Sequence, residues 1–349
     1  MNRIFAPLLA AGLALAPMTF TSVAHAQTKS SVSEAQDMLA WQQQYTQAIL
    51  GLLEIVDAEL MTEMYDVIDS EDAQRIETFG KRYASLRTAT LARGKRQIDA
   101  LPAPERWNIN PGLFNAQERA LYDVAKLQYD DANTMLAEFE TLTGTMVEML
   151  SNVETTSQER INALVDVQTA SGLRMIEMEN RQLDGFLRSI PETSPNHSLQ
   201  KIFKASNLFS MEEAKLNRDY IEDEDDISIR QGFGRAMERA LSDIPRLIAK
   251  GRRDYTSTRG NLQDILDSGQ GTAQERAFLS KAIVAMESFL DSFEVEEQLY
   301  ENMMSTSRLL RSSRSDLDIT ADRSAIDLAY FELSERQADL IMTRMAAMQ

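Results

Sequence analysis

The chain has 349 residues, and its 36 Lys and Arg against 54 Asp and Glu give a formal net charge of −18. This acidic balance argues against a general nucleic-acid-binding protein and against adhesion to anionic lipid. The sequence contains no cysteine, which excludes disulfides, thiol chemistry and a lipid-anchored cysteine.

The first 26 residues have the features of a secretory signal peptide. Arg3 supplies the positive start, a short apolar stretch follows, and Ala24-His25-Ala26 has the small-x-small pattern of a cleavage site. An uncleaved membrane anchor is the alternative interpretation. No later segment is apolar enough to cross a membrane. We therefore expect a mature chain without an integral membrane segment, in the periplasm of a Gram-negative bacterium or secreted by it.

Two matches at one offset indicate an internal duplication. The pentapeptide Ala-Gln-Glu-Arg-Ala at 116–120 recurs at 273–277, and residues 91–96 resemble residues 248–253. Both pairs lie 157 residues apart, since 273 − 116 and 248 − 91 give the same difference. Weaker matches continue in both directions, and one of them pairs Gln182 with Gln337. Each copy is then about as long as a whole domain.

The first copy predicts four long amphipathic helices. A capping box of Ser31 and Glu34 starts the first helix, and Pro102 follows the second, which is expected at about 72–101. Asn115 caps the third helix, whose apolar residues follow a strict 4-3 spacing with one polar member, Gln128. This spacing is typical of coiled-coil-like packing. The fourth helix is expected from a cap at residue 156 to about residue 190.

The second copy repeats this plan after a linker at 191–198 that is rich in proline and small polar residues. Helices are expected at about 198–221, at 226–266 with a kink near Pro245, at 273–311, and from about 320 to the end. Thr272 and Glu275 cap the third of these. No segment has a convincing strand pattern.

We therefore predict an all-α fold, built as a tandem duplication of two long four-helix bundles. One continuous elongated helical array is the alternative. The expected divisions are a signal peptide at 1–26, an N-terminal tail at 27–32, the first bundle at 33–190, the linker at 191–198 and the second bundle at 199–349. Each copy is expected to fold by itself.

Histidine argues against most metal centres and catalytic triads. His25 leaves with the signal peptide, and His197 lies in the predicted linker. Di-iron bundles need two Glu-x-x-His motifs, zinc sites need several His or Cys ligands, and the serine triad needs a histidine base. The two-bundle plan is similar to that of imelysin-like proteins in architecture alone, because their Gly-x-His-x-x-Glu motif is missing. We expect no enzyme activity and no cofactor.

Two other motifs could bind cations. Methionines spaced by three, such as Met175 and Met178, could bind Cu(I), but Tyr330 and Leu333 take their places in the second copy, which favours core packing. The acidic run at 222–226 could hold Ca²⁺, but it lacks the glycine and the distal glutamate of an EF-hand. A helix start is the favoured interpretation of this run.

Both copies place three cations around one glycine, at 93–96 and at 250–253. A structural interpretation is that cations near a helix end offset its dipole. Our hypothesis is that these clusters bind an acidic partner surface or an anionic ligand, with a loop tryptophan as a further contact. The candidate residues are Arg93, Lys95, Arg96, Trp107, Lys250, Arg252 and Arg253.

The leading interpretation is a non-enzymatic helical binding or scaffolding protein of the bacterial cell envelope that acts through protein–protein contacts. The alternative is a periplasmic ligand-sensing helical module that works with a separate membrane partner. Such a module is similar to the two-bundle helical sensor domains of chemoreceptors, which are normally flanked by two membrane spans. A protein partner is expected, and nucleic acid is not.

Overall fold

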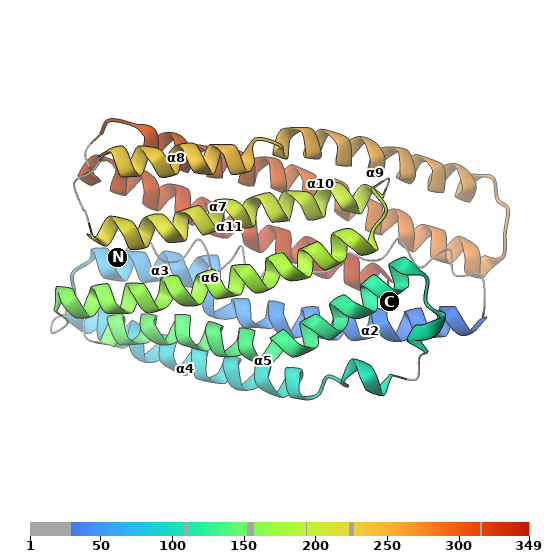
Figure 1. The fold of residues 1–349 in the computed structure, drawn as a ribbon, viewed down its shortest axis with the longest axis horizontal. Coiled ribbons are helices and arrows are strands. Elements are labelled where there is room, and N and C mark those ends of the chain that lie inside the picture. The colour runs from blue at the N-terminus through green and yellow to red at the C-terminus, as the bar shows by residue number, and fades with distance from the viewer. Residues whose placement is uncertain are drawn as a thin grey trace.

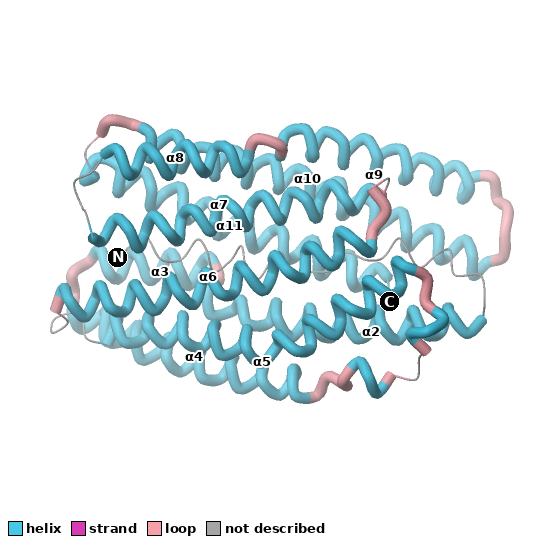
Figure 2. The backbone as a smooth tube through the Cα atoms, viewed as in Figure 1, coloured by secondary structure: helices cyan, strands magenta, loops and turns pink. Residues whose placement is uncertain are grey.

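The computed structural model describes residues 29–107, 110–151, 157–192, 194–222, 227–314 and 316–348. The predicted signal peptide, the cap at residue 156 and residues 223–226 of the acidic run lie outside these ranges. Within them every regular element is a helix, which confirms the all-α prediction. The helices lie side by side along the long axis of an elongated molecule (Figure 1), and mostly short loops join them (Figure 2).

In the first half the predicted first helix is divided. Asp57 causes the division, because its side chain accepts a hydrogen bond from the backbone N–H of Leu60 (2.7 Å) and so starts a new helix. The first helix also begins at Lys29, so Ser31 lies within it instead of capping it, and part of the predicted tail is helical. The elements are α2 (Lys29–Leu50), η2 (Gly51–Val56), α3 (Ala58–Asp69), α4 (Ala73–Asp99), η3 (Pro104–Arg106), η4 (Pro111–Leu113), α5 (Ala116–Ser151) and α6 (Gln158–Ser189).

In the second half the predicted kink is a complete break between two helices, just before Pro245. Proline has no N–H to continue the helical hydrogen bonding from the preceding turn. The predicted linker is too long, because a helix starts inside it at Pro195 and His197 is 8% exposed in its first turn. The elements are α7 (Pro195–Glu222), α8 (Ile227–Leu241), α9 (Ile244–Asp267), α10 (Ala273–Arg311) and α11 (Asp316–Met348).

The repeated pentapeptide starts a helix in both halves, as predicted. The backbone N–H of Asn115 donates to Glu118 Oε2 and the N–H of Glu118 donates to Asn115 Oδ1, both at 2.9 Å. Thr272 and Glu275 make the same reciprocal pair, at 2.6 and 3.2 Å. Each cap satisfies two backbone donors that have no partner inside the helix.

The apolar interior is continuous across the two halves. Buried side chains from Trp41 in α2 to Ile341 in α11 belong to one hydrophobic cluster. The helix α6 packs against both α5 and α7, and α3 packs against α11. The alternative expectation of one elongated array describes this interior better than two separate cores do, and the duplication itself stays a prediction.

The shared interior sets an expectation for the second half alone. A fragment of residues 196–349 keeps the mutual contacts of α7 to α11, so we expect a cooperative helical melt. Its melting temperature should lie below that of the whole chain, because removal of α6 and α3 exposes apolar surface. Circular dichroism on both chains measures this, and an unfolded fragment would show that the halves are not separate folding units.

Candidate functional site

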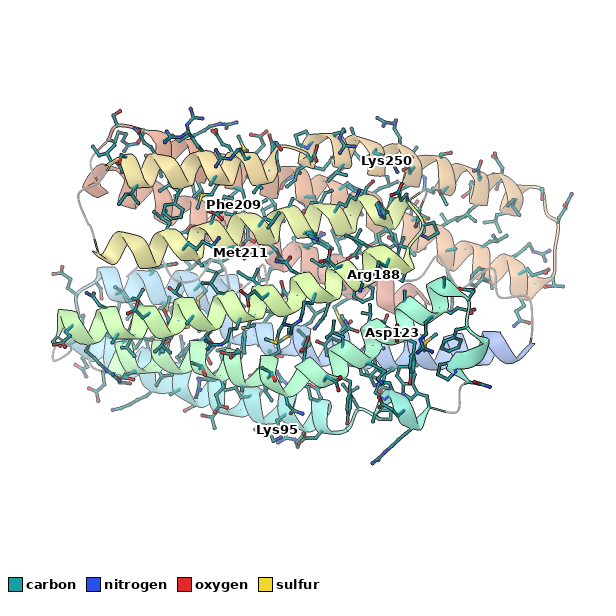
Figure 3. The ribbon with its side chains drawn as sticks, viewed as in Figure 1. Lys95, Asp123, Arg188, Phe209, Met211 and Lys250 are labelled. Carbon is teal, nitrogen blue, oxygen red and sulfur yellow. The ribbon has the colours of Figure 1, made fainter. Side chains whose placement is uncertain are left out.

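The two basic clusters lie on opposite sides of the array and cannot form one site. In Figure 3 Lys95 lies at the lower edge of the molecule and Lys250 near the upper edge. Carboxylates of the same chain already neutralise most of these cations. The ion pairs are Arg93–Glu54 (2.7 Å), Lys95–Asp99 (3.1 Å), Lys250–Asp254 (2.5 Å) and Arg252–Glu297 (2.8 Å).

The glycine in each cluster has a packing explanation. A Cβ on Gly251 would lie closer than 3.0 Å to three atoms of the Phe293 ring, and one on Gly94 would lie 2.5 Å from Leu52 Cδ2. Only glycine lets these neighbours approach so closely. The glycine therefore gives no independent support for an anion site.

Arg96 and Arg253 are exposed and are absent from these four ion pairs. Within the described part of the chain neither forms an ion pair with a carboxylate. An acidic partner would meet these two guanidinium groups first and would compete with the four carboxylates for the other cations. Partner binding at the clusters stays a prediction.

Trp107 packs within the chain. Its ring makes edge-to-face contacts with Trp41 of α2 at 5.6 Å and with Tyr122 of α5 at 5.9 Å, measured between ring centroids. Trp41 Nε1 in turn donates a hydrogen bond to the Pro102 carbonyl (2.9 Å). These contacts fasten the loop after α4 onto two helices, which is a structural role.

The most exposed large apolar side chains lie at the end of the α9–α10 hairpin. Phe278 is 55% exposed and Ile265 is 50% exposed. The hairpin runs past the C-terminal end of the chain in Figure 1, so its last turns have fewer neighbours than the rest of the array. We call these two residues, with the partly buried Leu262, Leu266 and Leu279, the arm tip.

The arm tip continues two helix faces that are buried nearer the centre. Phe278 lies three turns of 3.6 residues before Phe289 and on the same face. Phe289 is fully buried, with the guanidinium of Arg344 from α11 at 4.5 Å from its ring centroid. Ile265 lies five turns beyond Leu247, which is 4% exposed. On each helix the apolar face is therefore buried near the centre of the array and exposed at the hairpin end.

The first half shows what covers the equivalent position. At the offset of 157, Phe278 corresponds to Leu121, which is only 8% exposed. Leu121 belongs to a small apolar cluster with Met38 of α2 and with Phe186 and Ile190 of α6. Trp107 and Phe114 of the loop pack against this cluster.

Among the described residues nothing covers the second half in a comparable way. The loop segment that carries Trp107 in the first half is replaced by the last turns of α9. The helix α7 begins at Pro195, and Asn196 in its first turn accepts a hydrogen bond from the Tyr255 hydroxyl. Tyr255 stacks on Phe289 at 4.6 Å, so α7 starts at that level and does not extend to Phe278.

A second feature, which the sequence analysis missed, is a set of buried polar side chains where the two halves meet. Glu179 of α6 is fully buried, and neither of its carboxylate oxygens has a hydrogen-bond partner in the described residues. Burial raises the pKa of Glu179 well above its usual range, although the Asn207 amide acts in the opposite direction. Asn207 of α7 lies beside it, but its Nδ2 donates to Asn180 Oδ1 (3.3 Å).

The matched glutamines of the duplication belong to this set. Gln182 Nε2 donates to Asp131 Oδ2 of α5 (3.2 Å), and Gln337 Nε2 donates to Glu296 Oε1 of α10 (2.8 Å). Both glutamines are almost fully buried. Burial raises the pKa of Glu296 to about 8, although Arg344 and Gln337 act in the opposite direction. The Gln182–Gln337 match was the sequence signal that could have found this region.

Two buried tyrosines interact electrostatically with the buried acids. Burial raises the pKa of Tyr330 on α11, and the charges of Glu213, Glu296 and Glu179 raise it further. Burial likewise raises the pKa of Tyr45 on α2, and the charges of Asp131 and Glu179 raise it further. We call Tyr45, Asp131, Glu179, Gln182, Asn207, Glu213, Glu296, Tyr330 and Gln337 the polar seam; its members come from α2, α5, α6, α7, α10 and α11.

The paired methionines lie in the apolar core. Met175 and Met178 are 3% and 4% exposed, and Met146 accepts a hydrogen bond from the Tyr83 hydroxyl at 3.1 Å. A core role explains these side chains.

Over the described ranges, no three His, Cys, Asp or Glu residues are arranged to hold a metal ion. No helix in those ranges combines the length and the apolar character that a membrane span requires.

Comparisons of the chain with protein-family models, with curated proteins and with solved structures find no match.

Proposed function

We propose that the protein is a non-enzymatic helical binding protein of the bacterial cell envelope, and that it acts by contact with a protein partner. The signal peptide predicted at residues 1–26 supports the location. The arm tip supports protein binding, because two exposed apolar side chains continue faces that other helices cover elsewhere in the chain.

The partner at the arm tip is expected to present apolar side chains from a helix. The first half covers the corresponding residue, Leu121, with the α2 residue Met38 and with the ring of Trp107. A partner helix with similar side chains would complete the second half in the same way. Burial of one large apolar side chain contributes about 1.5–3 kcal/mol, so Phe278 and Ile265 are the expected anchors.

A photo-reactive amino acid at position 278 tests this proposal in cells that make the protein. The matched control is position 208, because Leu208 on α7 is 43% exposed but lies away from the hairpin end. We expect a discrete adduct with a second protein from position 278 and none from position 208. Equal adducts from both positions, or an adduct made only of two copies of this chain, would contradict the proposal.

The substitution Phe278→Asp should weaken partner binding without unfolding the protein. Removal of an anchor contact worth about 2 kcal/mol lowers affinity about thirtyfold. The melting temperature should change little, because Phe278 is more than half exposed. Titration of the cross-linked partner against wild type, Phe278→Asp and the control Leu208→Asp measures the effect. Equal losses in both variants would remove the arm tip as the binding surface.

A further inference from the structure

We propose that Glu179 is a proton-binding site at the junction of the two halves, and that loss of its proton loosens the contact between α6 and α7. The site belongs to the polar seam and is separate from the arm tip. A negative result for the Glu179 proposal therefore does not bear on partner binding at the arm tip, and the reverse also holds.

The geometry favours the neutral acid. Glu179 is fully buried, and both of its oxygens lack a hydrogen-bond donor in the described residues. An ionised carboxylate in such surroundings is strongly unfavourable unless a cation or several donors compensate it. The nearby cations are engaged elsewhere, since Arg181 pairs with Asp131 (3.1 Å) and Lys204 pairs with Asp184.

The seam is also rich in hydrogen-bond acceptors. Gln182 Oε1, Gln337 Oε1 and Asn207 Oδ1 have no donor in the part of the chain that the structure describes. The amide orientations are fixed, because the nitrogen of each donates to a neighbouring oxygen. A proton on Glu179 makes the carboxyl group a donor, and Asn207 lies beside it. Ionised Glu179 would instead add one more acceptor where donors are lacking.

The titratable groups around Glu179 reinforce this preference. The phenols of Tyr45 from α2 and Tyr330 from α11 interact with the charge of Glu179, and each also interacts with other acids: Tyr45 with Asp131 from α5, and Tyr330 with Glu213 from α7 and Glu296 from α10. Arg344 of α11 acts on Glu296 and Tyr255. Ionisation of Glu179 therefore places a negative charge among groups that do not neutralise it.

The direction of the pH effect follows from linkage. A glutamate in the unfolded chain titrates near pH 4.3, and the folded chain keeps the Glu179 proton to a higher pH. The stabilising contribution is therefore complete below about pH 4 and is lost as the pH rises towards the folded-state pKa. The unfolding equilibrium constant should increase by about tenfold per pH unit from this group alone.

Urea unfolding of the whole chain at pH 5.5 and pH 7.5 tests the proposal. The substitution Glu179→Gln keeps the shape of the neutral acid and cannot ionise. Between these pH values the ratio of the wild-type unfolding constant to that of Glu179→Gln should rise, by about tenfold for each pH unit that lies below the folded-state pKa. The matched control is Glu177→Gln on the exposed face of the same helix, which should follow the wild type. A constant ratio for Glu179→Gln would overturn the proposal.

An infrared measurement keeps the test decisive if Glu179→Gln does not fold. The wild type at neutral pH should show the carbonyl band of a protonated carboxylic acid. Because the pKa of Glu296 is also raised, Glu296 could give the same band. The band must therefore persist in the variant Glu296→Gln to be assigned to Glu179. Its absence there would show that Glu179 is ionised. Where Glu179→Gln does fold, amide exchange in α6 and α7 at pH 8 should be faster in wild type than in this variant, and equal rates would refute loosening.

Discussion

Replacement of Gly251 by alanine is expected to destabilise the protein by about 1–3 kcal/mol, the usual effect of overpacking a core. The added Cβ would lie closer than 3.0 Å to three atoms of the Phe293 ring. Phe293 is fully buried and tilts against Tyr255 at 5.7 Å, so the ring has little room to move. Urea unfolding measures the change.

Gly260→Ala is the matched control on the same helix. A Cβ at Gly260 would have no atom within 4 Å, so this change should stabilise the helix by about 1 kcal/mol. Gly94→Ala should cost less than Gly251→Ala, because the neighbour there is the flexible end of Leu52. If Gly251→Ala proves neutral, close packing does not explain the glycine between the cations, and an anion-binding role for the clusters gains weight.

Replacement of Arg344 by methionine is expected to destabilise the protein by about 3 kcal/mol, the sum of a lost charged hydrogen bond and a buried cation–π contact. Arg344 is 1% exposed, and its guanidinium donates to the Ser288 carbonyl (3.1 Å) and to the Ser292 hydroxyl. The same group covers the ring of Phe289. Methionine keeps most of the volume but supplies no donor.

Arg336→Met is the control for this change, because Arg336 is exposed on the same helix and its loss should alter stability by less than about 0.5 kcal/mol. Equal effects of the two substitutions would show that the buried contacts of Arg344 contribute little. Chemical denaturation at pH 7 compares the two variants.

The stability of Arg344→Met should also depend on pH differently from that of the wild type. Arg344 now lowers the pKa of Glu296, which burial has raised to about 8. Without the guanidinium this pKa should rise further. A glutamate with a raised folded-state pKa destabilises the protein progressively between its unfolded and folded pKa values. The part of this loss that comes from Glu296 should therefore end near pH 8 in the wild type and continue beyond it in Arg344→Met.

Local features of this fold were predictable because their causes lie within a few residues. Asn115 and Thr272 cap helices through bonds to groups three positions away. The break before Pro245 follows from the missing N–H of proline. The 4-3 spacing in α5 predicted a buried face, and Ala132, Met135 and Phe139 are buried there.

The polar seam could be predicted only in part. Gln182 matched Gln337 across the copies. That match does not say which acid accepts a hydrogen bond from each amide, because Asp131 and Glu296 lie on other helices. The burial of Glu179 depends on α7 and α11, whose positions beside α6 no local pattern specifies.

The sequence by itself determined the helical class, most helix ends and the inward faces, since hydrogen bonding and apolar periodicity act within a few turns. Tertiary structure alone decided which faces are covered, because cover depends on where other helices end. Leu121 is buried because α2 and the Trp107 loop reach it. Phe278, in the matching position, stays exposed because α7 starts too late to reach it.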